Sequence, residues 1–128
     1  MKYLCMGYLD SKAMDARPKP EIDAVMQECW SHMKEFNAKG QVIVDAGLEL
    51  QAKCLRRANG AMVVTDGPFA ETKEVVGSVF IIEARDIEEA IKFASLHPSM
   101  RVDAGEQLGW RVEIRPIHHF QHNQSEVK

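Results

Sequence analysis

Charged side chains that could exchange protons are concentrated in residues 65–74, between two apolar segments of the chain. This decapeptide reads TDGPFAETKE and holds four charged residues and one aromatic ring. Asp66 is the residue best suited to proton transfer, because an aspartate partly withdrawn from water can act as a general acid or base. Loops at the mouths of strands commonly carry binding and chemistry, so residues 65–74 are the first candidate site.

The first residues of this decapeptide also have a purely structural explanation. Asp66 can bond to its own downstream backbone, Gly67 tolerates dihedral angles that other residues avoid, and Pro68 fixes φ in a turn. A rigid turn leaves the aromatic ring and the later charges unexplained, unless those charges form a solvated run. If the decapeptide lines a pocket with Asp66 as its catalytic group, the expected ligand contacts are Gly67, Pro68, Phe69, Glu71 and Lys73.

Two side chains outside the decapeptide could complete such a site. His32 could pair with Asp66 as an acid/base dyad, but it lies in the apolar stripe of a predicted helix, where a packed histidine with one hydrogen bond is the alternative. Arg115 alternates with apolar residues along the last predicted strand. It could contact an anionic group in a pocket or simply meet water, since a half-solvated strand shows the same alternation.

Metal and cofactor chemistry are not expected from the motifs of this chain. Three histidines near the end, at positions 118, 119 and 122, have no neighbouring carboxylate pattern that would fix a coordination geometry. The sequence contains no glycine-rich phosphate loop and no HExxH motif. We therefore expect no metal site and no cofactor.

Composition narrows the class of protein. The 128 residues suit one domain with its own core, and a net charge of −3 with dispersed basic residues argues against a nucleic-acid partner. Three cysteines at spacings unlike any metal motif predict small buried thiols in a reducing compartment. The apolar run at residues 3–9 is too short for a signal peptide or a membrane span, so we expect a cytoplasmic protein without membrane contact.

Hydrophobic periodicity predicts the elements that must position the candidate site. Apolar residues at steps of three and four predict helices at residues 20–39 and 86–97. The Asn59-Gly60 pair predicts a hairpin with a type I′ turn. Polar stretches predict loops at 10–20 and 99–109, and a flexible tail at 118–128 after a single domain at 1–117. The predicted strands are 3–9, 42–44, 53–57, 61–65, 75–83 and 110–117.

This order of elements predicts a ferredoxin-like α+β fold of split βαβ type, with an antiparallel sheet and its helices on one face. Two helices cannot cover both sides of the sheet, yet residues 3–9 and 75–83 are apolar on both faces. A second copy of the chain is the simplest cover, and burying apolar area is worth roughly 25 cal/mol per Å². We therefore expect a homodimer with a cavity between its sheets.

The decapeptide resembles the signature of the DGPF branch of the YCII-related proteins, whose biochemical role is mostly unassigned. The likeness extends to the opening strand, to Lys39-Gly40 and to residues 112–116. It implies a dimeric α/β barrel with a pocket at which Asp66 is the functional carboxylate. Relatives in that branch often have an aromatic residue at the position of His32, which weakens the dyad.

Three hypotheses about function follow from the residues and the resemblance together. The first is an enzyme that performs acid/base catalysis on an unknown small molecule through Asp66, with Arg115 as an anion contact. The second is a ligand-sensing or protein-interaction module without turnover that uses the same pocket. Because some relatives are linked to sigma factors, such a module could serve transcriptional regulation. The third is a scaffold that acts through its dimer face and has no ligand-sized cavity.

Overall fold

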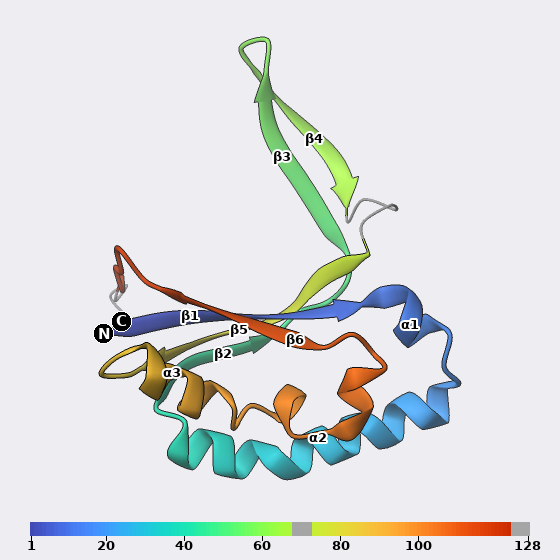
Figure 1. Ribbon diagram of the computed structural model, residues 1–128. Helices are drawn as coiled ribbons and strands as arrows, with labels where there is room; N and C mark the ends of the chain where they lie inside the picture. Colours follow the sequence, from blue (N-terminus) through green and yellow to red (C-terminus); the bar gives the residue numbers. More distant parts are fainter. Residues whose placement is uncertain (68–72, 124–128) are drawn as a thin grey trace, which may run out of the picture.

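The computed structural model describes residues 1–67 and 73–123, and its sheet has the predicted ferredoxin-like order (Figure 1). The predicted contacts Pro68, Phe69 and Glu71 lie outside the described residues. The four strands are antiparallel in the order β2-β5-β1-β6, so the apolar first strand is central as predicted. Their bounds are β1 (Lys2–Asp10), β2 (Val42–Gly47), β5 (Glu74–Glu83) and β6 (Arg111–Pro116).

Two helices, α2 (Lys19–Lys39) and α3 (Ile87–Ala94), lie on the same face of this sheet (Figure 1). Pro20 lies in the first turn of α2, and Gly40 closes its end by donating its backbone N–H to the carbonyl of Phe36. Asp86 caps α3 by accepting from the backbone N–H of Glu89. In the part of the chain that the structure describes, no helix combines the length and apolar character needed to cross a membrane.

The core lies between this sheet face and the helices. Alternate residues of β1 point toward the helices, and Tyr3 and Cys5 are fully or almost fully buried, as are the residues opposite them on β5. Phe36 of α2 packs edge-on against Phe80 of β5, with ring centroids 5.1 Å apart. The strand residues that alternate with these core residues point to the opposite, open face of the sheet, where Val44 of β2 is 45% exposed. Within the described residues, that face has no helix over it (Figure 1).

A separate two-stranded sheet, formed by β3 (Ala52–Ala58) and β4 (Ala61–Gly67), projects from the open side of the main sheet (Figure 1). Asn59 and Gly60 both have positive φ, 52° and 77°, which confirms the predicted type I′ turn. Three apolar side chains of this hairpin are more than half exposed, namely Leu55, Met62 and Val64.

The two predicted loops contain short helices, so these predictions were wrong. Helix α1 (Ser11–Asp15) forms because Asp10 accepts hydrogen bonds from the backbone N–H groups of Lys12 and Ala13. The second loop forms the 3₁₀ turns η1 (Pro98–Met100) and η2 (Asp103–Glu106). Helix α3 ends at Ala94, earlier than expected, because His97 begins the next turn as its N-cap. The flexibility of the tail stays a prediction.

Candidate functional site

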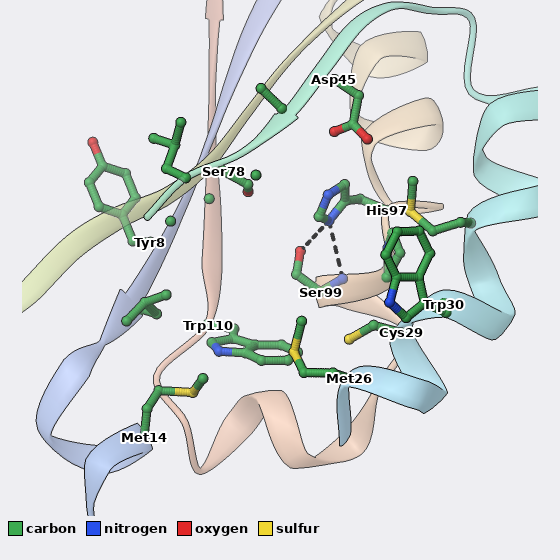
Figure 2. Close-up of a pocket in the computed structure, with 18 of the residues that line it drawn as sticks. Tyr8, Met14, Met26, Cys29, Trp30, Asp45, Ser78, His97, Ser99 and Trp110 are labelled. Atoms are coloured by element: carbon green, nitrogen blue, oxygen red, sulfur yellow. Dashed lines mark hydrogen bonds between the residues drawn. The ribbon is translucent and has the colours of Figure 1, made fainter. Parts of the chain in front are cut away.

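A pocket of about 440 Å³ opens between the helix side of the sheet, helix α2 and the segment around η1 (Figure 2). Its size falls within the range of roughly 300–1,000 Å³ that small-molecule sites occupy. The walls are mostly apolar, and their larger side chains are Met14, Met26, Met33, Trp30 and Trp110. Apolar walls with a few polar groups are typical of a ligand site.

Two glycines and a bulge in β1 and β5 shape the wall formed by the sheet. Gly7 faces Ser78 across the two strands, and a side chain at position 7 would collide with the Ser78 hydroxyl. Gly77 likewise leaves room for the side chain of Leu9. The strand register shifts between Gly7 and Tyr8, which redirects the following side chains. The Ser78 hydroxyl can therefore reach the pocket lining.

His97 is held at the pocket by ring packing and hydrogen bonds. Its ring stacks on Phe80 at a centroid distance of 4.5 Å and meets the edge of Phe36 at 5.0 Å. The backbone N–H of Ser99 donates to Nδ1 at 3.1 Å, and the Ser99 hydroxyl lies 2.7 Å from the same nitrogen. Because Nδ1 accepts, the proton of the neutral ring resides on Nε2.

Burial lowers the pKa of His97 from 6.5 to about 4, since the charged ring would lose its hydration. His97 is therefore neutral at pH 7. In that state its Nε2–H can donate a hydrogen bond but cannot act as a base. The imidazole thus supplies one fixed donor to a pocket that is otherwise largely apolar.

Asp45 brings a carboxylate to the same pocket. It stands directly opposite Phe80 in the β2–β5 pairing, so its side chain shares the helix-side face with the ring on which His97 stacks. Figure 2 shows the carboxylate of Asp45 pointing toward His97. Partial burial raises the pKa of Asp45 above its ordinary value, although water still reaches the side chain.

The mouth of the pocket is apolar and exposed. Trp30 on helix α2 is 68% exposed and contributes to an exposed apolar patch. Other large apolar side chains line the same pocket while more than a third exposed, namely Met26, Leu48 and Leu50. An exposed apolar rim around a cavity is typical of a surface that receives a ligand or a partner.

The predicted catalytic residue Asp66 lies elsewhere. Its side chain is 84% exposed and forms an ion pair with Lys53 across the β3–β4 hairpin. Strand β4, which carries Asp66, and helix α2, which carries the half-buried His32, lie on opposite sides of the main sheet (Figure 1). Within one chain the structure does not bring the two residues of the predicted dyad together. The catalytic roles of Asp66 and His32 stay predictions.

The other predicted contacts are also scattered. Arg115 projects on the open face, paired in register with Leu4. Lys73 borders a second, more polar hollow beside Tyr8 and Glu74. Gly67 lies at the base of the hairpin, where an added side chain would approach Cys54 Sγ to 3.0 Å. Their roles as ligand contacts stay predictions.

Glu74, which lines the second hollow, forms an ion pair with Arg111. Arg111 holds both carboxylate oxygens of Glu74, at 2.7 and 2.9 Å, while its guanidinium lies 4.2 Å from the centre of the Tyr8 ring. The hydrogen bonds from Arg111 lower the pKa of Glu74. Since the two charges neutralise each other, this pair braces β5 and β6 and leaves little free charge for a ligand.

Sequence reasoning did not single out Asp45, Ser78 or His97. A histidine directly before Pro98 at the end of a helix, and an aspartate inside an apolar strand, were the only signals. Among the described residues, no cluster of three or more histidine, cysteine, aspartate or glutamate side chains is arranged to hold a metal. The three cysteines are free thiols, in β1, α2 and β3.

The strand order and the helices on one face define an α+β protein of ferredoxin-like architecture with a pocket beneath the sheet. The chain belongs to the YCII-related family, since the YCII-related domain matches residues 1–117. It is also similar to an "uncharacterized protein" of Rhizobium meliloti (strain 1021), with 32% identity over 119 residues that cover 91% of this chain and 92% of the relative. Membership of the DGPF branch stays a prediction.

Proposed function

We propose that the protein binds a small, largely apolar molecule in the pocket beneath the sheet. The observation that carries this proposal is the convergence of Asp45, Ser78 and His97 on one apolar cavity of about 440 Å³. Burial moves the pKa values of Asp45 and His97 away from their ordinary ranges, and titratable groups perturbed in this way concentrate at functional sites. Asp45 and His97, rather than Asp66, are the polar anchors in this proposal.

A turnover reaction at the same pocket is the second candidate. The neutral imidazole of His97 would donate its Nε2–H to a carbonyl oxygen, and the Asp45 carboxylate would take a proton from the neighbouring carbon or heteroatom. The raised pKa of Asp45 favours this role, because a stronger base accepts the proton more readily. Without turnover, the same contacts would serve a ligand sensor, including one linked to transcription.

The open face of the sheet supports the proposal of a homodimer. Val44 and the hairpin residues Leu55 and Met62 are 45%, 60% and 61% exposed there, and a second copy would cover them. Packed sheets lie about 10 Å apart, so Asp66 and Arg115 would then border the enclosed space between the protomers. We also propose a cytoplasmic location.

The dimer can be tested by light scattering. The wild-type protein should be a dimer at micromolar concentration, and Val44→Asp should convert it to a monomer. A monomeric wild-type protein would refute the dimer.

The binding proposal can be tested with the protein's own fluorescence, because both of its tryptophans, Trp30 and Trp110, line the pocket. The neutral apolar dye N-phenyl-1-naphthylamine should bind saturably and quench both. Cys29→Phe places a ring inside the pocket and should weaken dye binding by at least about tenfold. Ser31→Phe adds the same ring to an exposed position of helix α2 and should leave it unchanged.

Two outcomes of this experiment would count against the pocket. One is dye binding that does not saturate, and the other is equal affinity in the Cys29→Phe and Ser31→Phe variants. Compounds found afterwards in a metabolite screen by the same quenching should be followed over time. Consumption of a bound compound would favour turnover, and persistence would favour a sensor.

A further inference from the structure

The charges around the pocket beneath the sheet have one sign. Among the described residues that line it, Asp45 is the one with a formally charged side chain, and none is lysine or arginine. His97, the other strongly polar group, is neutral at pH 7 and donates a single hydrogen bond. An anionic ligand would therefore meet a like charge and no cation, which is unfavourable in a site partly closed to water.

The walls of the pocket suit a cation with an apolar body. The rings of Trp30 and Trp110 line it, and the faces of such rings attract ammonium groups. The sulfur atoms of Met14, Met26 and Met33 add soft, polarisable surface to the same walls. Aromatic rings grouped around one carboxylate are the usual surroundings of a bound organic ammonium group.

The hydrogen-bonding side chains of the lining include donors, such as the indole N–H groups of Trp30 and Trp110, and the one that can only accept is Asp45. The two carboxylate oxygens of Asp45 accept only, and the hydroxyl of Ser78 can accept as well as donate. An ammonium group has three donors and no acceptor, so it matches these groups and leaves His97 Nε2–H for a neighbouring oxygen or ring of the ligand. A neutral ligand would cover Asp45 without compensating its charge, which costs binding free energy.

We infer that the molecule taken by this pocket is a primary or secondary amine, bound as the ammonium ion, with an aromatic or otherwise apolar body. The inference rests on the proposed binding function and adds the ligand's charge and head group. Its contacts are an ion pair with Asp45, ring faces from Trp30 and Trp110 around the body, and the Ser78 hydroxyl beside the head. The exposed carboxylate of Glu49, near the mouth, adds to the attraction at long range.

The test compares three probes of nearly equal size that differ in charge: 2-phenylethylamine, 2-phenylethanol and phenylacetate. Each is titrated against the protein loaded with N-phenyl-1-naphthylamine, and displacement gives its affinity. We expect the amine to bind at least about tenfold more tightly than the alcohol, and the acid to bind more weakly than both. The alcohol isolates the contribution of the apolar body.

Two isosteric variants assign the charge selection to a residue. Asp45→Asn should remove the advantage of the amine over the alcohol while leaving alcohol affinity within about twofold. Glu49→Gln removes a carboxylate a few residues away and should retain most of that advantage. A thermal unfolding curve for each variant shows that the fold is intact.

A pH series supplies a second readout on the unmodified protein. The amine's affinity should fall as acid protonates Asp45, while alcohol affinity stays level above pH 5. The other titratable groups that face the pocket are Tyr8, Cys29 and His97, and the same pH series on Asp45→Asn separates their effect on the amine from that of Asp45. Burial holds the pKa of Cys29 above and that of His97 below its ordinary value, so neither gains charge near neutrality.

The outcomes separate this inference from the function on which it rests. Equal affinity for amine and alcohol, or preference for the acid, would overturn the amine assignment while the dye still shows a working pocket. An amine that fails to displace the dye at millimolar concentration would overturn it equally. Failure of the dye itself to bind would instead remove the pocket proposal.

Discussion

The β3–β4 hairpin and the pocket beneath the sheet place carboxylates in opposite surroundings. On the hairpin, Asp66 is 84% exposed and paired with Lys53, itself 69% exposed. In the pocket, water still reaches Asp45, but this residue lies beside a half-buried imidazole and among apolar walls, and partial burial shifts the pKa values of both groups. Water screens the first pair and is partly removed from the second.

This difference shows why a dense motif is a weaker guide to chemistry than solvation. Residues 65–74 concentrate charge, but the described part of this segment meets water on the hairpin and at the start of β5. Asp45 and His97 lie in unremarkable stretches of sequence, yet the fold places them together. Reactivity depends on the medium around a group as much as on its type.

The largest effect should come from removing the core ring on which His97 stacks. Phe80 is fully buried between Phe36 and His97, so Phe80→Ala should lower the free energy of unfolding by about 3–5 kcal/mol. Val64→Ala on the hairpin, where the side chain is 52% exposed, should cost less than about 1 kcal/mol. Urea denaturation measures both. Similar losses of unfolding free energy in the two variants would mean that the hairpin belongs to the cooperative core. The hairpin and the core would then not differ in stability.

The acid sensitivity of His97 should be the next largest effect. In the unfolded chain its pKa is near 6.5 and in the fold about 4, so the unfolded state takes up the proton first as pH falls. The stabilisation is complete above pH 6.5 and is lost as pH falls to about 4, an effect of up to about 3 kcal/mol.

Variants at two histidines isolate this contribution. His97→Phe keeps an aromatic ring between Phe36 and Phe80 but cannot titrate, so unfolding free energies measured from pH 7 to pH 4 should lose this part of their slope. His119→Phe, at an exposed position after β6, should keep the full slope. An unchanged slope in His97→Phe would show that water reaches the imidazole freely.

Much of the fold was predictable because its signals are local. Alternation and runs of apolar residues predicted the strands, and the Asn59-Gly60 pair predicted its turn type from two residues. The ferredoxin-like order followed from the sequence of elements. Helix α1 was missed because its signal is one capping side chain, Asp10, in a polar stretch that resembles a loop.

The candidate site was not predictable for a different reason. Asp45 is placed on the same side of the sheet as His97 by the register of β2 on β5, which includes a shift between Val42 and Val44. His97 is placed by its stacking on Phe80 and its bonds to Ser99. The strand pairing and the ring stacking join residues far apart in the chain, and no local pattern encodes them.

A smaller effect is expected from the exposed ring at the mouth of the pocket. Trp30→Ala should weaken binding of N-phenyl-1-naphthylamine by about fivefold, because the ring covers the mouth while staying 68% exposed. Met62→Ala on the hairpin removes a side chain that is 61% exposed and should leave binding unchanged. Fluorescence of the dye reports both. A larger effect from Met62 would indicate that the hairpin of a second copy reaches the pocket.

The smallest effect should be at the Lys53–Asp66 ion pair of the hairpin. Both partners are mostly exposed, so a double-mutant cycle with Lys53→Ala and Asp66→Ala should give a coupling free energy below about 1 kcal/mol. The coupling should shrink further in high salt, because mobile ions screen exposed charges. Urea denaturation with and without added salt measures it.

Asp66→Asn extends that test from stability to function. It removes the charge with almost no change of shape, and it should leave dye binding unchanged, because Asp66 does not line the pocket. If a substrate is found and Asp66→Asn abolishes its turnover while Asp45→Asn does not, the proton carrier is at the hairpin. Since Asp66 is exposed in one chain, such a result would require a second protomer to withdraw Asp66 from water. The same variants should then be assayed as monomers, which the Val44→Asp substitution produces.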